Sequence, residues 1–418
     1  MDILSVFGIR GRPKEVHRLS DALRDAGIHP ALVPDSVKIA VIKLLRENDG
    51  GKIADIEELE PGKSDVRFLL KLQPEAEGLP TALDSPLCVP VPPPAPPSTL
   101  AHLHSVDQLT PAHLRYLFDE ADAMGAMVRT RGRCDRLRGA LLANVFYEPS
   151  TRTSASFHAA MLRLGGGVVP VQASASSACK GESLADTVRC LDRYCDVIVL
   201  RHPDEGSARE AADVARVPVL NAGDGVGEHP TQALLDAYTI RRELGWGGLK
   251  GEAPPKPWRV TFVGDLKHGR TVHSLAKLLA THFHVTLRCV SPVSLRLPEA
   301  VCDAVHATGT PLVDTTDLTG ALAETDVLYV TRIQKERFAT AAEYEAVQGA
   351  YRIDASVLQA LPATGVVMHP LPRMDELHTD VDTDPRAAYF RQMEYGLHVR
   401  MALLAWLVEG GVGSRNHQ

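Results

Sequence analysis

The segment PSTRTS at residues 149–154 combines several hydroxyl side chains with one arginine at a predicted turn from strand to helix. Hydroxyls and backbone N–H groups at a helix start favour an anion, and the arginine Arg152 adds a bidentate donor. The alternative is an ordinary helix, capped by Ser150, with an exposed arginine. Because so many donors share one turn, we predict a phosphate site at Ser150, Thr151, Arg152 and Thr153.

A second candidate group surrounds His229. This histidine follows a glycine-rich stretch, residues 221–225, and precedes Pro230, Thr231 and Gln232. A lone histidine is usually structural, but the polar neighbours Thr231 and Gln232 favour a ligand-binding role. Arg201, which follows another apolar run, is equally consistent with binding and with a surface position.

Three more cations have two interpretations each. Lys180 lies beside Gly181 in the polar segment 176–186, which is either a solvated loop or a loop that brings a positive charge to a distant phosphate. Arg270 and Arg332 follow later apolar runs. Two arginines facing one cleft suit a ligand with two carboxylates, and surface ion pairing is the alternative.

Short apolar runs and amphipathic stretches alternate after about residue 100, and they are the elements that must position these side chains. The strand candidates are Ala140–Phe146, Val197–Leu200, Val217–Leu220, Val260–Val263, Val285–Val290, Val327–Val330 and Val366–Met368. The helical candidates between them include Thr151–Leu164, Pro230–Leu244 and Thr271–Leu279. Short Val-rich runs without polar alternation are typical of parallel strands covered on both faces, so we predict two doubly wound α/β domains. Ligands bind beyond the carboxyl ends of such strands, where the candidate residues lie.

Glycine and proline mark the ends of the predicted helices. The run Gly165-Gly166-Gly167 is expected to end the first helix, Pro230 to begin the second, and Gly245 to follow its last turn.

The run VPVPPPAPP at residues 89–97 predicts an extended linker, 89–100, after an N-terminal extension, 1–88. The apolar stretch 37–45 in that extension fits a helix or a buried strand, and no chemical motif occurs there. The role of the extension stays open.

The composition of the chain argues against several classes of binding partner and cofactor. With a net charge of −7 the chain has no global basic field for nucleic acid, and no apolar run is long enough for a membrane span. The seven cysteines are odd in number and contain no CxxC pair, which favours reduced thiols in a cytoplasmic protein and no zinc site. The sequence also lacks GxGxxG at Gly264, a P-loop, HExxH and GxSxG. We therefore expect no cofactor and no metal.

The residues resemble the aspartate carbamoyltransferase family, from about Leu103 to Gly410. The matching stretches are FYEPSTRTSASF, KGESLADT, VLRHP, NAGDGVGEHPTQALLD, VGDLKHGRTVHSL, LYVTRIQKERF, HPLPR and DPRAAYFRQ. The amino-acid sequences of these stretches most resemble the catalytic domain of eukaryotic multifunctional pyrimidine-synthesis proteins. The resemblance implies a carbamoyltransferase fold with a carbamoyl-phosphate-binding domain at 101–243, an aspartate-binding domain at 244–395, and a C-terminal helix and tail, 396–418, returning to the first domain.

The resemblance also implies roles. Ser150, Thr151, Arg152 and Thr153 would hold the phosphate. Thr153, Arg201 and His229 would polarise the carbamoyl oxygen, while Gln232 and the Leu371 carbonyl would bind the carbamoyl amino group. The Leu371-Pro372 bond would be cis. The aspartate carboxylates would be bound by Arg270, Arg332 and Gln334.

The same resemblance implies a homotrimer in which Ser176 and Lys180 come from a neighbouring subunit, and association with other enzymes of pyrimidine synthesis. Two alternatives remain. Ornithine enzymes have HCLP where this chain has His369-Pro370-Leu371-Pro372, so ornithine is disfavoured as the second substrate. A non-catalytic scaffold would have lost Arg152, Lys180 or His229, and all three are present.

Overall fold

The computed structural model describes residues 53–58, 68–72, 97–98, 100–172, 181–245, 249–250 and 256–415. The chain divides into two compact units, Met1–Pro94 and Ala95–Gln418. In the first unit, β1 (Ile53–Glu58) and β2 (Phe68–Leu72) pair antiparallel, with Glu58 opposite Phe68. The undecided stretch 37–45 and most of the predicted linker lie outside the described residues.

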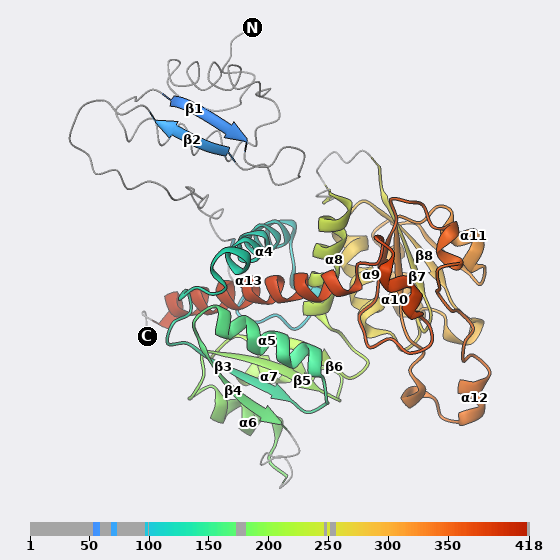
Figure 1. Cartoon of the computed structure of the whole chain (residues 1–418). Helices are drawn as coiled ribbons and strands as arrows, with labels where there is room; N and C mark the ends of the chain where they lie inside the picture. The colour runs from blue at the N-terminus through green and yellow to red at the C-terminus, as the bar shows by residue number, and fades with distance from the viewer. Residues whose placement is uncertain are drawn as a thin grey trace. The chain divides into compact units, whose positions relative to one another are not determined.

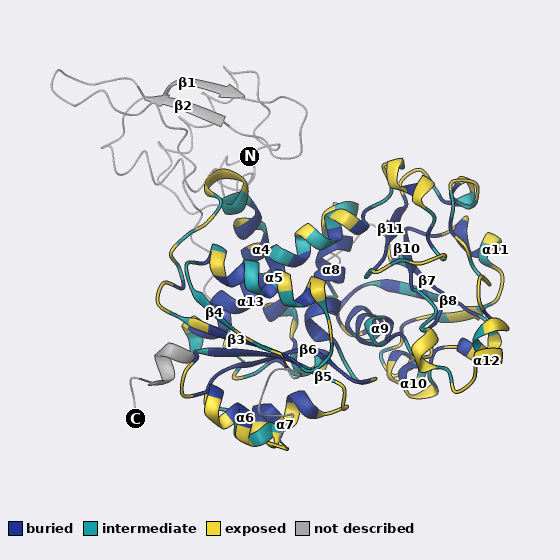
Figure 2. Ribbon diagram, turned by 60° about the horizontal axis from the view of Figure 1, so that its bottom comes forward, coloured by how far each residue is buried: buried dark blue, intermediate teal, exposed yellow. Residues whose placement is uncertain are grey.

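The second unit contains two parallel sheets. The first has the strand order β4-β3-β5-β6. Its strands are β3 (Leu141–Phe146), β4 (Gly167–Gln172), β5 (Val197–His202) and β6 (Val219–Asp224). Its helices are α4 (Pro111–Arg131), α5 (Thr151–Arg163), α6 (Leu184–Leu191), α7 (Ser207–Val214) and α8 (Pro230–Leu244), with the 3-10 turn η2 (Val106–Gln108) before α4. Helices α4 and α5 lie on one side of this sheet, and α6 and α7 lie on the other (Figure 2).

The second sheet has the order β11-β10-β7-β8-β9 and is also parallel throughout. Its strands are β7 (Trp258–Val263), β8 (Val285–Val290), β9 (Leu312–Thr315), β10 (Val327–Val330) and β11 (Val366–Met368). Its helices are α9 (Arg270–His282), α10 (Glu299–His306), α11 (Leu318–Leu322) and α12 (Ala341–Glu345), with 3-10 turns η5 (Val293–Leu295), η6 (Lys335–Arg337), η7 (Val357–Ala360) and η8 (Thr379–Thr383). The prediction of two parallel-sheet α/β domains is confirmed.

The long helix α13 (Tyr389–Arg415) joins the two domains (Figure 1). It begins next to β11 of the second sheet and then packs against α8, α5 and α4. Trp406 and Leu403 on this helix are buried with strand residues of both sheets in one continuous core. The outer faces of the two sheets have separate, smaller cores. The two sheets therefore share one core, which holds them in a defined position relative to each other.

The predicted strands match the observed ones closely, with one shift. The run expected at Val217–Leu220 forms a strand only from Val219, and the strand continues through the glycine-containing residues to Asp224. In the described part of the second unit, two strands were not predicted, β4 and β9, and both lie at sheet edges. β4 contains Pro170, and an edge strand tolerates proline because one side of its backbone needs no partner.

Helix punctuation is also largely as predicted. Helix α5 ends at Arg163 and is followed by Gly165 with a left-handed backbone, φ 87°. Helix α8 begins at Pro230 and is closed by Gly245, φ 68°.

Candidate functional site

The turn from β3 to α5 carries the predicted phosphate-binding residues. The side chain of Asn144 on β3 donates to the Ser154 carbonyl (3.2 Å) and hydroxyl (3.0 Å), which holds the first turn of α5 against the strand. Thr153 is buried here, whereas Thr151 and Arg152 are exposed. The helix start is thus rigidly placed, with its polar groups on the accessible side.

The alternative in which Ser150 caps an ordinary helix with its side chain is wrong for α5. Ser150 occupies the N-cap position, but its side chain makes no cap hydrogen bond, and its backbone angles are φ −156° and ψ 86°. By comparison, Ser183 at φ −70° and ψ 154° caps α6 through the Asp186 N–H. The Ser150 hydroxyl is therefore not committed to the helix terminus.

Arg152 reaches from α5 to the loop after β11. Its Nη2 donates to the Leu371 carbonyl over 2.8 Å, which links residues of the two domains. The Leu371-Pro372 bond is cis, as predicted, and Leu371 has φ 55°. The backbone N–H of Leu371 donates to Nδ1 of His369 (2.8 Å), which orients the loop.

Arg201, at the end of β5, and Arg270, at the start of α9, lie side by side. Both contact the Glu148 carboxylate, at 3.2 Å for Arg201 and 3.4 Å for Arg270. Arg201 also donates to the Ala222 carbonyl (3.3 Å), and Arg270 donates to the Gly225 carbonyl. Burial, together with the neighbouring Arg270, lowers the pKa of Arg201 to about 10. A cluster with more cations than anions is a favourable place for negatively charged ligands.

Gly223 shows how closely these two arginines approach the backbone. It has φ 116°, and a Cβ at this position would lie 3.2 Å from guanidinium atoms of both Arg201 and Arg270. The glycine-rich stretch before His229 is thus needed to let two guanidinium groups lie against the chain.

His229 is buried immediately before α8. Its backbone N–H donates to the Ser274 hydroxyl (3.0 Å), and its Nδ1 lies 3.4 Å from the Thr231 hydroxyl. The preceding loop is fixed by Asp224, which accepts the Glu228 N–H at 2.7 Å. Burial and the charges of Arg201 and Arg270 keep the pKa of His229 well below its ordinary value. The imidazole is therefore neutral at physiological pH and can donate a hydrogen bond without carrying charge.

Gln232 lies in the first turn of α8 and is almost fully buried. Its Nε2 donates to Asp236 Oδ1, one helical turn further on, over 2.9 Å. The side-chain amide is therefore oriented by a carboxylate on the same face of the helix.

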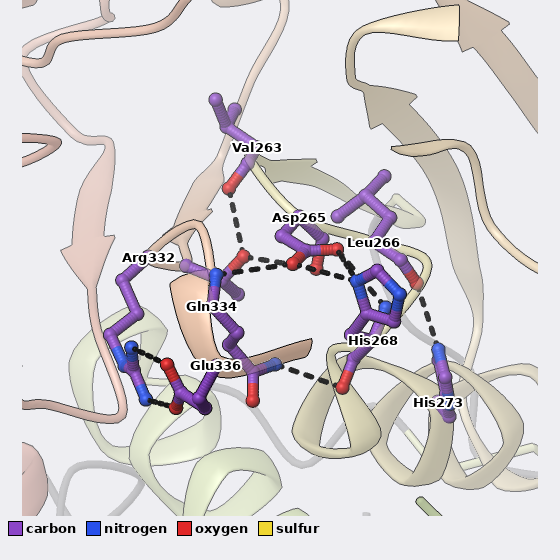
Figure 3. A network of polar contacts seen from close by, with 9 residues as sticks. Val263, Asp265, Leu266, His268, His273, Arg332, Gln334 and Glu336 are labelled. Atoms are coloured by element: carbon purple, nitrogen blue, oxygen red, sulfur yellow. Dashed lines mark hydrogen bonds and ion pairs between the residues drawn. The ribbon is translucent and has the colours of Figure 1, made fainter. Parts of the chain in front are cut away.

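Asp265, after β7, organises the residues of the second domain (Figure 3). Its carboxylate accepts the His268 N–H (3.0 Å) and the Gln334 N–H (3.2 Å) and lies 3.1 Å from Nδ1 of His268. The Gln334 side chain in turn donates to the His268 carbonyl (2.9 Å). These contacts join the loop after β7 to the loop after β10.

Arg332 forms an ion pair with Glu336, one turn further along the chain (Figure 3). The two arginines expected to face one dicarboxylate are thus each paired with a carboxylate of the chain, Arg332 with Glu336 and Arg270 with Glu148. A partly buried guanidinium is costly without acceptors, which accounts for both pairs. Partial burial of the Arg152 guanidinium lowers the pKa of Arg152, and the charge of the nearby Arg332 lowers it further.

Lys180 and Ser176 lie outside the described residues. The helix α6 follows them and begins at Leu184.

Sequence reasoning assigned no role to Glu148, Asp236 or Asp265. Each lies within five residues of a predicted site residue, and Asp236 is spaced four residues from Gln232 on one helix face. The short spacing between these acidic residues and predicted cationic or amide site residues was the sequence signal that could have indicated their roles.

In the described part of the chain, no group of three or more His, Cys, Asp or Glu side chains is arranged to hold a metal ion. Among the same residues no helix combines the length and apolarity needed to cross a membrane.

Two family models match the chain. Residues 101–242 match the carbamoyl-P binding domain of aspartate/ornithine carbamoyltransferase, and residues 256–407 match its Asp/Orn binding domain. The chain is 54% identical over 306 residues to the multifunctional protein ura1 of Schizosaccharomyces pombe, an alignment that covers 73% of this chain and 13% of that protein. It spans 13–16% of the length of the multifunctional relatives it matches.

A shorter relative is matched over nearly its whole length. The aspartate carbamoyltransferase catalytic subunit of Thermococcus gammatolerans is 48% identical over 301 residues, covering 72% of this chain and 95% of the subunit. Among solved structures, aspartate transcarbamoylase from Trypanosoma cruzi in complex with carbamoyl phosphate is similar, with a TM-score of 0.70 and 44% identity over 75% of this chain and 98% of that one. The two domain models and the match to nearly the whole length of a catalytic subunit show that the chain belongs to the aspartate carbamoyltransferase family.

Proposed function

We propose that this chain transfers the carbamoyl group of carbamoyl phosphate to the amine of L-aspartate, giving N-carbamoyl-L-aspartate and phosphate. The observation that carries the proposal is the convergence of Arg152, Arg201, Arg270 and His229, from both domains, around one set of strand ends. Both substrates are anions, and the cluster supplies the opposite charge.

In this mechanism the start of α5 holds the phosphate of carbamoyl phosphate. Ser150, Thr151, Arg152 and Thr153 provide hydroxyl, backbone and guanidinium donors, which suit phosphate oxygens. The uncommitted hydroxyl of Ser150 supports this assignment.

The carbamoyl oxygen then faces Thr153, Arg201 and His229. Negative charge develops on this oxygen when the aspartate amine attacks the carbamoyl carbon, and preorganised donors stabilise that charge. A neutral His229 can act as such a donor. The C–O bond to phosphate breaks, the phosphate leaves, and the amine loses a proton, for which the departing phosphate is the nearest base.

Arg270, Arg332 and Gln334 would bind the two carboxylates of aspartate. To bind there, a carboxylate of aspartate must displace Glu336 from Arg332. The Arg332 guanidinium then exchanges one bidentate carboxylate partner for another. Ornithine carries a second ammonium group instead of a second carboxylate, so this set of residues favours aspartate.

The decisive assay measures turnover of carbamoyl phosphate with aspartate and with ornithine side by side. We expect turnover with aspartate and none with ornithine. Activity with ornithine alone would overturn the substrate assignment, and no activity with either would favour the non-catalytic scaffold.

The Arg152→Ala variant tests the phosphate site in the same assay. We expect kcat/KM to fall about 10²–10³-fold, the usual effect of removing one donor to a developing charge. The thermal midpoint should change little because Arg152 is exposed on α5. Near-normal turnover would contradict the assignment.

We further propose a homotrimer in which Ser176 and Lys180 complete the site of the neighbouring subunit. Neither Lys180→Ala nor Arg152→Ala trimers would then have an intact site, but mixed trimers would. A 1:1 mixture should recover about a quarter of the wild-type activity if subunits exchange at random. No recovery after confirmed exchange would count against shared sites.

The same reaction would place the chain in pyrimidine biosynthesis, in the cytoplasm, in association with other enzymes of that pathway. The similarity to multifunctional relatives supports the association with other enzymes. Copurification of tagged full-length chain with such enzymes would test it.

A further inference from the structure

Asp236 is a fully buried carboxylate at the junction of the two domains, and the mechanism above does not use it. It lies on α8, one turn after Gln232. Its neighbours come from three elements: Gln232 on α8, Tyr329 on β10 and Gln392 on α13.

The hydrogen bonds to Asp236 have a defined direction. Oδ1 accepts from two side-chain amides, Gln232 Nε2 at 2.9 Å and Gln392 Nε2 at 2.6 Å. Oδ2 accepts from the Tyr329 hydroxyl at 2.7 Å. Because Oδ1 accepts from both amides whether or not Oδ2 carries a proton, both glutamines must turn their nitrogen toward Asp236.

The orientation of Gln232 follows directly. With Nε2 held by Asp236, the other end of the amide is an oxygen, Oε1. No described residue donates a hydrogen bond to this oxygen. It is thus available to accept an N–H from a ligand.

The second amide transmits the orientation to the loop after β11. Gln392 Oε1 accepts the His369 N–H at 3.0 Å. His369 Nδ1 then accepts the Leu371 N–H (2.8 Å), and its Nε2 lies 2.8 Å from Glu376. Burial lowers the pKa of His369, so a neutral ring that accepts at Nδ1 and donates from Nε2 fits both contacts. The position of the Leu371 carbonyl is thus tied to the same carboxylate.

We infer that Asp236 is a positioning residue that turns two acceptor oxygens, Gln232 Oε1 and the Leu371 carbonyl, toward the amino group of the carbamoyl substrate. The inference rests on the proposed function, since it concerns the carbamoyl half of that site. Its consequence is specificity: the site distinguishes a carbonyl group that bears NH₂ from one that bears CH₃. A site built to accept N–H groups rejects an analogue that lacks them, because its acceptors are left unpaired.

Two stable ligands separate this effect from phosphate binding. Phosphonoacetamide has the amide NH₂ of the carbamoyl group, and acetonylphosphonate has a methyl group in its place. Calorimetric titration of the full-length chain with each ligand gives a ratio of affinities, and inorganic phosphate reports the phosphate subsite alone.

The Asp236→Ala variant should lower the amide-to-methyl affinity ratio about tenfold, as expected when one or two neutral hydrogen bonds are lost. Binding of inorganic phosphate should be unchanged. Asp236→Asn should restore most of the ratio, because its carbonyl oxygen can accept from both glutamines while its NH₂ faces the Tyr329 oxygen. A role in stability alone would weaken all three ligands together and would not give this pattern.

Tyr329→Phe is the matched control. This variant removes the hydrogen bond to Oδ2 of Asp236 and leaves Oδ1, which contacts both amides, unchanged. The amide-to-methyl affinity ratio should therefore stay within about threefold of the wild-type value. Gln392→Leu breaks only the connection to His369 and should lower the ratio by a smaller factor, which also provides the test if Asp236→Ala does not fold.

An unchanged ratio in folded Asp236→Ala, or in Gln392→Leu if the alanine variant does not fold, overturns the inference while leaving the proposed function standing. If the wild-type chain binds neither phosphonate and does not turn over carbamoyl phosphate with aspartate, the proposed function fails, and this inference fails with it.

Discussion

At the scale of single residues, the site is governed by the burial of charged and titratable groups near one another. Arg201 and Arg270 share one carboxylate, Glu148, and His229 lies beside both arginines. Burial disfavours the charged imidazole, and the two neighbouring positive charges disfavour it further, so His229 stays neutral. The same arrangement favours anions.

The first prediction concerns the protonation of His229. Because burial and the two arginines lower the pKa of His229, the folded imidazole should remain neutral from pH 8 to pH 6. In the unfolded chain this histidine binds a proton near pH 6.5, and in the folded chain it does not. The free energy of unfolding should therefore fall as the pH drops below 6.5. NMR of histidine-labelled protein measures the titration, with the signal assigned by its disappearance in His229→Asn. A signal that titrates near pH 6.5 would contradict the prediction.

The second prediction concerns Asp236. Burial raises the pKa of this carboxyl to about 7 in the folded state, from 3.8. A raised pKa means that the folded state holds the proton more tightly, so the associated stability is present at low pH and is lost as the pH rises through 7. Asp236→Asn cannot ionise and lacks this dependence.

Denaturant unfolding of the wild type and Asp236→Asn at pH 5, 6, 7 and 8 tests the second prediction. The stability of the wild type relative to the variant should fall with increasing pH, by at most about 1.4 kcal/mol per pH unit for one group. Parallel curves for the two proteins would show that Asp236 keeps an ordinary pKa.

At the scale of elements, the ends of the parallel strands determine where the site residues lie. The chain leaves β7 through Gly264, which has φ 118°, and a Cβ there would lie 2.2 Å from the Thr331 carbonyl oxygen. Thr331 follows β10 and donates its N–H to Val263 (2.8 Å). Gly264 thus lets two neighbouring strand ends approach, and these lead to Asp265 on one side and to Arg332 on the other.

The third prediction is that Gly264→Ala destabilises the second domain and raises the KM for aspartate more than that for carbamoyl phosphate. A left-handed backbone alone costs about 1–2 kcal/mol for alanine. The contact with Thr331 adds to this cost. Gly349→Ala is a suitable control, since Gly349 has φ 72° and no atom within 4 Å of an added Cβ. Equal losses of unfolding free energy in the two variants would rule out the steric contribution.

At the scale of the whole molecule, two sheets share one core through α8 and α13. The buried residues of this core run from Leu103 to Val408, inside the unit Ala95–Gln418. Arg152 and Leu371, which belong to different domains, can therefore form a hydrogen bond of 2.8 Å.

The fourth prediction is that residues 95–418 alone fold cooperatively and retain the kcat/KM of the full chain within about twofold, because a compact domain with its own core can fold independently. Circular dichroism melting and the aspartate assay on the fragment and on the full-length chain measure both properties. A fragment that is folded but much less active would assign a catalytic contribution to residues 1–94.

The sequence by itself determined most of the parallel-sheet architecture. Unbroken apolar runs such as Val327–Val330 can only be buried strands or helices, and their short length and β-branched residues favour strands. Local signals also located Pro230 and Gly245 at the ends of α8, because proline and glycine act on their own backbone. Edge strand β4 escaped prediction because its glycine and proline resemble a turn.

The family motifs predicted the residues that we propose to bind the substrates, and the structure brings Arg152, Arg201, His229, Arg270 and Leu371 together. Contacts between segments far apart in the chain were not visible in the sequence. Asp236 meets Tyr329, 93 residues away, and Gln392, 156 residues away.

Such contacts depend on how the sheets pack, and packing is a property of the shared core rather than of any local pattern. The sequence thus determined on which strand ends the candidate site residues lie, and it predicted which of them would carry the chemistry. The tertiary structure alone decided which carboxylate orients each of them, because only the folded core brings distant segments within hydrogen-bonding distance.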